Sequence, residues 1–244
     1  IRSEYDFSAL KSEAVVEELL TGRLLILVSD EVGHKLSEEM PPSLLERCKF
    51  READTWGCFM NDARLTNYEV KQLLTQMRPQ AGRLPSHYER VSALHLSTAQ
   101  LGADAQQDLA EYLKLETCIL RTLDLSNTHI DAAAISQALA LNSSLRSVDV
   151  RAIPKMAESF EKLGDMLLQP NSTSRLAYIR CDAFEVLEGE TVLSLRERPL
   201  VKGAMRLLTG LLKHNREVLE LDLAATRLQK DWATTLIEAI ATNP

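Results

Sequence analysis

Residues 120–150, LRTLDLSNTHIDAAAISQALALNSSLRSVDV, contain one pattern of apolar residues twice. The first copy begins at Leu120 and the second at Leu145, and each has further apolar residues three and five positions later. Asp124 and Asp149 stand at the same place in the two copies, between the last two apolar residues. This alternation predicts a short strand with one buried face. The aspartates are therefore expected on the opposite face, outside the core. We expect them to be part of a structural scaffold that presents a binding surface.

The same pattern recurs along the chain. Clear copies begin at Val91, Leu120, Leu145, Leu176 and Val218. A weaker copy begins at Trp56, with Asn61 in place of the third apolar residue, and another at Leu24, with Ser29 in that place. Apolar residues then recur every three to four positions after the strand pattern, which predicts an amphipathic helix. The chain is thus expected to alternate strand and helix.

An asparagine precedes several of the predicted strands, as in LALNSSL (139–145) and LLKHNREVLELDL (211–223). These asparagines are Asn142, Asn171, Asn215 and Asn243. With the apolar triplets, they make the chain similar to leucine-rich-repeat proteins of the ribonuclease-inhibitor-like subtype. The resemblance implies an α/β solenoid, a curved array with a parallel inner sheet and outer helices, here with five clear and two degenerate repeats. Curvature also follows from spacing, because strands pack about 4.8 Å apart and helices about 8–10 Å apart.

The predicted domain organisation has an N-terminal helical cap over residues 1–23 and a repeat array over 24–244. Within the array, residues 24–90 hold the degenerate repeats and 91–244 the clearer ones, interrupted by an insertion at 183–200. We expect the array to continue beyond the C-terminal end or to be covered there by a partner, since a solenoid without a polar cap exposes its last apolar flank.

The insertion is predicted to form a hairpin about Glu188 and Gly189 that contacts a partner. A flexible loop is the alternative. The apolar side chains assigned to this contact element are Val186, Val192, Leu193 and Leu195.

The inner face of the sheet is the predicted partner-binding surface, because polar residues alternate with the apolar triplets. The residues assigned to it are Met60, Asp62, His95, Asp124, Asp149, Arg151, Tyr178, Arg180, Asp182, Glu220 and Asp222. Two interpretations stay open. The face is either a mildly acidic surface for a partner with a basic surface, or a solvated face that keeps the sheet in solution.

Catalysis is not expected. His95, Ser97 and Asp124 fall on neighbouring strands, but no nucleophile elbow or oxyanion loop accompanies them. Asp124 and Asp149 on an open sheet would have little reason to separate their pKa values into an acid and a base. The glycines form no phosphate-binding motif, and the histidines and cysteines have no metal-ligand spacing. No cofactor and no metal are predicted.

The net charge of −7 and the isoelectric point near 5.4 argue against nucleic acid or an anionic membrane as partner. The longest apolar run, Leu24 to Val28, is far shorter than the roughly 20 residues of a membrane-spanning helix, so no membrane insertion is expected. The four cysteines are expected to be free thiols in a reducing, intracellular compartment.

The predicted function is that of a non-enzymatic scaffold for protein–protein interaction, and no catalytic residues are predicted. Such a scaffold could be a subunit of a larger assembly. The family resemblance implies the same, because its members mostly bind proteins, among them inhibitors, innate immune sensors and actin-associated proteins. The family also includes a GTPase-activating protein. A regulator that docks on a small GTPase is therefore the alternative.

Overall fold

The computed structural model describes residues 56–59, 64–78 and 91–243. The predicted helical cap, the degenerate copy at Leu24 and the inner-face residues Met60 and Asp62 lie outside the described residues. The described part is a mixed α/β fold with six helices and a mainly parallel sheet.

Six strands form the largest sheet, and they follow one another across it in chain order. Neighbours are parallel except the last two, which are antiparallel. The strands are β1 (Trp56–Phe59), β3 (Val91–His95), β5 (Thr122–Asp124), β6 (Ser147–Asp149), β7 (Tyr178–Arg180) and β8 (Glu185–Val186). Every strand predicted from a clear copy is confirmed, and so is the strand predicted from the weaker copy at Trp56.

Two further pairs of parallel strands accompany the large sheet. They are β2 (Arg64–Leu65) with β4 (Gln100–Leu101), and β9 (Val192–Ser194) with β10 (Glu220–Asp222). The prediction of one inner sheet that includes the strand at Val218 is therefore wrong. The large sheet ends at β8, which turns antiparallel to β7, and β10 pairs with β9 instead.

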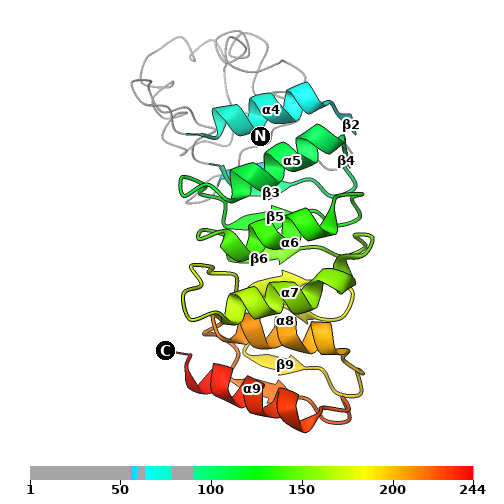
Figure 1. Cartoon of the computed structure of the whole chain (residues 1–244), viewed down its shortest axis with the longest axis vertical. Helices are drawn as coiled ribbons and strands as arrows, with labels where there is room; N and C mark the ends of the chain where they lie inside the picture. The colour runs from blue at the N-terminus through cyan, green and yellow to red at the C-terminus, as the bar shows by residue number, and fades with distance from the viewer. Residues whose placement is uncertain (1–55, 60–63, 79–90, 244) are drawn as a thin grey trace, which may run out of the picture.

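The helices lie side by side in chain order along the long axis, with the strands behind them (Figure 1). They are α4 (Asn67–Gln76), α5 (Ala103–Leu113), α6 (Ala132–Leu141), α7 (Met156–Leu168), α8 (Lys202–Leu212) and α9 (Lys230–Ala241). Side-chain caps fix some of their starts. Thr66 and Glu69 form a reciprocal capping box at α4, and Asp131 accepts hydrogen bonds from two backbone N–H groups of α6.

The core lies between the sheet and the helices. Leu94, Leu123, Val148 and Ile179 stand in register on β3, β5, β6 and β7, and none is more than 1% exposed. The helices contribute a matching stripe, such as Leu109 of α5. The middle residue of these four apolar triplets is thus a core residue, as its spacing predicts.

Two asparagines join the end of a helix to the following strand. The Asn142 side-chain amide donates to the Leu113 carbonyl at 2.6 Å, and its oxygen accepts from the Leu145 N–H at 2.6 Å. Asn215 repeats this arrangement, with its oxygen accepting from the Val218 N–H at 2.9 Å. Each side chain satisfies backbone groups in the segments that connect helices and strands. Asn171 differs, because it is exposed.

Asn142→Ala is expected to lower the free energy of unfolding by about 2–3 kcal/mol, because it leaves buried backbone donors and an acceptor without partners. Urea unfolding measures the change. Asn171→Ala is the matched control, with an expected change of about 0.5 kcal/mol or less. Equal losses at the two positions would contradict the structural role assigned to Asn142.

The segment 183–200 is built into the fold, and the prediction that it forms a hairpin is wrong. Instead of pairing with each other, β8 pairs with β7 and β9 pairs with β10. Val186, Leu193 and Leu195 are no more than 2% exposed, whereas Val192 is 49% exposed. Leu193 is in register with Leu221 of β10, so it occupies the core position of an apolar triplet.

Candidate functional site

The side of the strands that faces away from the helices carries a row of polar residues, which we name the strand face. His95, Asp124, Asp149 and Arg180 stand in register on the four neighbouring strands β3, β5, β6 and β7. The structure thus brings together the central members of the predicted inner face. Glu220 and Asp222 lie apart from them on β10, in the smaller β9–β10 sheet.

Asp124 sits at the centre of a small polar cluster. Its Oδ1 accepts hydrogen bonds from the Ser126 N–H at 2.9 Å and the Ser126 hydroxyl at 2.7 Å, and its Oδ2 lies 3.7 Å from His95 Nδ1. Burial acts to raise the pKa of Asp124, but the hydrogen bonds from His95 and Ser126 outweigh it and leave the pKa below its ordinary value. The group is a carboxylate at neutral pH.

The same cluster bears on the possibility of a serine nucleophile. A Ser-His-Asp triad needs the imidazole between the hydroxyl and the carboxylate. Here the Asp124 carboxylate lies between the His95 imidazole and the Ser126 hydroxyl, and Ser126 Oγ is also 2.9 Å from Ser97 Oγ. These contacts order the turn after β5. They do not place the Ser126 hydroxyl against the His95 imidazole, as a serine nucleophile and its base would require.

Asp149 differs from its sequence counterpart Asp124, because Arg151 covers it. The Arg151 Nε donates to both carboxylate oxygens, at 3.0 and 3.1 Å, and Asp149 is only 8% exposed. The hydrogen bonds to Asp149 raise the pKa of the Arg151 guanidinium. The prediction that Asp149 stands open to solvent is therefore wrong. It is the buried half of an ion pair whose cation stays partly exposed.

The ion pairs continue across the face toward β8. Glu185 lies 3.4 Å from Arg151 Nη1 and 3.9 Å from Arg180 Nε. Asp182 uses its carboxylate differently, accepting a hydrogen bond from the Ala152 N–H at 2.9 Å. Asp182 therefore ties two turns together, while Arg151, Arg180 and Glu185 present charges that are held in place.

Tyr178 is also placed differently from its prediction as a contact residue. It is 2% exposed, and the Arg146 guanidinium lies 5.9 Å from the centre of its ring. Burial, together with a hydrogen bond to Glu217, raises the pKa of Tyr178 to about 12. The exposed group at this point is Arg146.

Arg121 and Arg146 are exposed residues at the starts of β5 and β6, next to the strand face, and the sequence prediction missed them. They stand one residue before β5 and β6, and the N–H groups of both Arg146 and Ser147 donate to the Arg121 carbonyl. Among the described residues, neither arginine forms a salt bridge. The sequence could have indicated both arginines, because each directly follows the first apolar residue of its triplet.

On the separate β9–β10 sheet, Asp222 is paired while Glu220 is not. The Arg196 Nε donates to Asp222 at 2.9 Å. The hydrogen bond from the Ala224 N–H, followed by the one from Arg196, holds the pKa of Asp222 below its ordinary value. Glu220 is exposed and forms no salt bridge with any residue in the described part of the chain.

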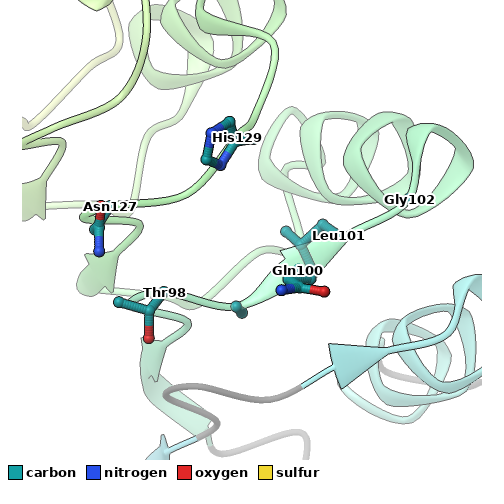
Figure 2. A pocket seen from close by; sticks show the side chains of 7 residues that line it. Thr98, Gln100, Leu101, Gly102, Asn127 and His129 are labelled. Carbon is teal, nitrogen blue, oxygen red and sulfur yellow. The ribbon is translucent and has the colours of Figure 1, made fainter.

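A hollow of about 550 Å³ opens between the turns after β3 and β5, beside the N-terminal end of α5 (Figure 2). Its lining is Thr98, Ala99, Gln100, Leu101, Gly102, Asn127 and His129. Among the described residues of this lining, His129 is the one titratable group, and no carboxylate accompanies it there.

Within residues 56–59, 64–78 and 91–243, no group of three or more histidines, cysteines, aspartates and glutamates could hold a metal ion. No helix in this part is long and apolar enough to cross a membrane. Cys118 and Cys181 are buried free thiols, and burial raises the pKa of Cys181 to about 11.

No protein-family model matches the chain, and no curated protein matches its sequence. The similarity to leucine-rich-repeat proteins therefore stays a prediction from the apolar triplets and asparagines.

Asp124→Asn is expected to destabilise the protein by about 1–2 kcal/mol at pH 7, because charge-assisted hydrogen bonds to Ser126 and His95 are weakened. The folded-state pKa of Asp124 is below its unfolded value near 3.8, so the carboxylate stabilises the fold fully above that pH. The stabilisation is lost as the pH falls through the folded pKa. Urea unfolding of both proteins between pH 7 and pH 2.5 should show the difference shrinking only below about pH 4. A difference that stayed constant over this range would contradict the assignment.

Proposed function

We propose that this chain is a leucine-rich-repeat scaffold of the ribonuclease-inhibitor-like kind, and that it binds another protein on its strand face without catalysing a reaction. The in-register core residues of β3, β5, β6 and β7 support a repeated strand–helix unit. The matching hydrogen bonds of Asn142 and Asn215 support it independently, because they recur at the same place in two units.

The observation that carries the binding proposal is the adjacent pair of exposed arginines, Arg121 and Arg146. Neighbouring strands lie about 4.8 Å apart, so the two cations project from one small area. Arg151 adds a third cation, fixed by Asp149 and therefore needing little further ordering when a partner binds. Arginines that lie close together and keep their donors accessible favour carboxylate-rich partners.

The charge of the partner follows from which groups remain accessible. Arg151 covers Asp149, and Asp124 is occupied by Ser126 and His95. The cations are thus the more accessible charges near the starts of β5 and β6. We accordingly propose an acidic protein segment as the partner, in place of the basic one expected from the count of aspartates. Nucleic acid is a poor alternative, because a few exposed arginines on a chain of net charge −7 are too few to displace the counterions along a phosphate backbone.

The test is a comparison of proteins captured from a lysate of the native source by the full chain and by the double variant Arg121→Glu, Arg146→Glu. Capture of the specific partner should fall at least about tenfold, since reversing two interface charges typically costs more than 1.4 kcal/mol. Lys162→Glu, an exposed charge reversal on α7, is the control and should retain capture. Capture unaffected by the double variant would reject the strand face as the binding surface.

A further inference from the structure

The loops that lead from a helix into a following strand carry more cations than anions. They comprise residues 114–121, 142–146, 169–177 and 213–219, which lie along one side of the molecule, on the left of Figure 1, and we name them the strand-start edge. Their charged residues are the cations Lys114, Arg121, Arg146, Arg175, Lys213 and Arg216 and the anions Glu116 and Glu217. Six cations against two anions make this edge positively charged, although the whole chain has a net charge of −7. Such a local excess attracts anions.

One of these cations serves the fold. The Lys213 Nζ donates to the carbonyls of Leu168 and Gln169, at 3.1 and 2.9 Å, at the C-terminal end of α7. A cation at this place complements the negative end of the helix dipole. Arg121, Arg146 and Arg175 differ from Lys213, because they are exposed and their guanidinium groups donate to no acceptor within residues 56–59, 64–78 and 91–243. Capping of helices therefore does not explain these three arginines.

The three arginines stand at the starts of the neighbouring strands β5, β6 and β7. The Arg146 N–H donates to the Arg121 carbonyl at 2.8 Å. The Ala177 N–H, two residues after Arg175, donates to the Arg146 carbonyl at 3.0 Å. Arg146 is thus the middle cation, with one arginine on each side. Its guanidinium lies 5.9 Å from the centre of the Tyr178 ring, a contact that favours one orientation of the side chain.

The surroundings of Arg146 leave its charge without a direct ion pair in the described part of the chain. The loops 142–146 and 169–177 contain no aspartate or glutamate. The Glu217 carboxylate is close enough to act on Arg146, but it accepts hydrogen bonds from the Gly189 N–H, at 2.6 Å, and from the Tyr178 hydroxyl. These hydrogen bonds, followed by the charge of Arg146, hold the pKa of Glu217 below its ordinary value. Glu217 is therefore occupied by other donors.

We propose that the acidic partner presents a phosphorylated side chain to the strand-start edge, and that Arg146 binds the phosphoryl group together with Arg121 and Arg175. The phosphoryl site rests on the proposed function, because Arg121 and Arg146 belong to both. A carboxylate has one negative charge and two oxygens, which a single guanidinium occupies in a bidentate pair. A phosphoryl group has a charge of about −1.5 to −2 and three acceptor oxygens, so it accepts from two or three guanidinium groups at once.

The spacing of the arginines also favours one group with two charges over two carboxylates. Neighbouring strands place Arg121 and Arg146 about 4.8 Å apart at the backbone. Acidic side chains on one face of an extended segment are two residues apart, which is about 6.6 Å. A phosphoryl group between the two arginines needs no such match of spacings.

The probes are three fluorescein-labelled peptides with one acidic host sequence of aspartate and glycine. The central residue is phosphoserine in the first and serine in the second, and the third has two adjacent glutamates there, so that its charge matches the first. Fluorescence anisotropy with the full chain is measured at about 0.15 M salt, where non-specific attraction is largely screened. The phosphoserine peptide should bind at least about tenfold more tightly than the diglutamate peptide.

Arg146→Gln should weaken binding of the phosphoserine peptide at least about tenfold and remove its advantage over the diglutamate peptide. Arg198→Gln is the matched control, because Arg198 is an exposed arginine that follows β9, at the opposite end of the strands. It should retain both the binding and the preference. Circular dichroism confirms that each variant is folded, since both replaced side chains are exposed.

Equal binding of the phosphoserine and diglutamate peptides, with both weakened by Arg146→Gln, would overturn the phosphoryl site and still support an acidic partner at these arginines. A preference that Arg146→Gln leaves intact would overturn it too. No binding of any peptide would also overturn it, and the capture experiment with Arg121 and Arg146 reversed would then decide the proposed function by itself. Phosphatidylcholine vesicles with phosphatidylinositol bisphosphate give the last outcome. Sedimentation with these vesicles that depends on Arg146, without binding of the phosphoserine peptide, would assign the arginines to a lipid surface and overturn the proposal.

Discussion

Leu123→Asp is expected to lower the free energy of unfolding by about 4 kcal/mol or more, enough to unfold the middle of the protein at ordinary temperature. Leu123 is fully buried between Leu94 and Val148 on the neighbouring strands. A carboxylate there would lose its hydration and gain no cation. Chemical unfolding followed by circular dichroism measures the loss.

Thr122→Asp is the matched control, because it introduces the same side chain one residue earlier, on the partly exposed strand face. Its expected cost is about 1 kcal/mol or less. Similar losses in the two variants would mean that the strand is not in the register described, and the residues assigned to the strand face would change with it.

Gly164→Val is expected to cost about 3 kcal/mol or more through steric overlap between α7 and α8. A Cβ atom at Gly164 would lie 2.6 Å from the Leu207 backbone nitrogen and closer still to the Arg206 carbonyl group. Backbone atoms of a packed helix cannot move aside as a flexible side chain can, so the helices would have to separate. The midpoint of thermal unfolding, measured by calorimetry, reports the effect.

Gly203→Ala on the facing helix is the control, because its Cβ would be 3.3 Å from the nearest atom, the Glu161 backbone nitrogen. The gain in helix propensity of up to about 1 kcal/mol offsets that tight contact, and the net change should be small. A Gly164→Val protein as stable as the original would show that α7 and α8 do not approach each other at this residue.

The strands and helices were largely predictable from the sequence, because apolar spacing reports directly which side of an element is buried. Leu94, Leu123 and Val148 are core residues for this reason. The fate of residues 183–200 was not predictable in the same way. Leu193 and Leu195 stand at the last two positions of an apolar triplet, but Glu190 stands at the first. This copy therefore did not match the pattern of three apolar residues. Its pairing with β10 depends on contacts distant in sequence.

The central residues of the strand face were predictable from the sequence, and their electrostatics were not. Alternation alone places Asp124 and Asp149 on the same side, and the structure confirms their register. Whether such a carboxylate is accessible depends on which side chain folds over it. Arg151 reaches back over Asp149, whereas Ser126 follows Asp124 at the equivalent place and leaves it more exposed. The residue two positions after the aspartate, Arg151 or Ser126, thus decides which charge a partner would contact.

The account's central claim, that the strand face binds a protein partner, is tested most directly by hydrogen–deuterium exchange of the full chain with and without the captured partner. The account predicts slower exchange in peptides covering residues 119–127 and 144–152, which contain β5, β6 and their arginines. Exchange in α5 and α6, on the opposite side of the sheet, should stay unchanged. Slower exchange confined to these helices, with no change at Arg121 and Arg146, would contradict it.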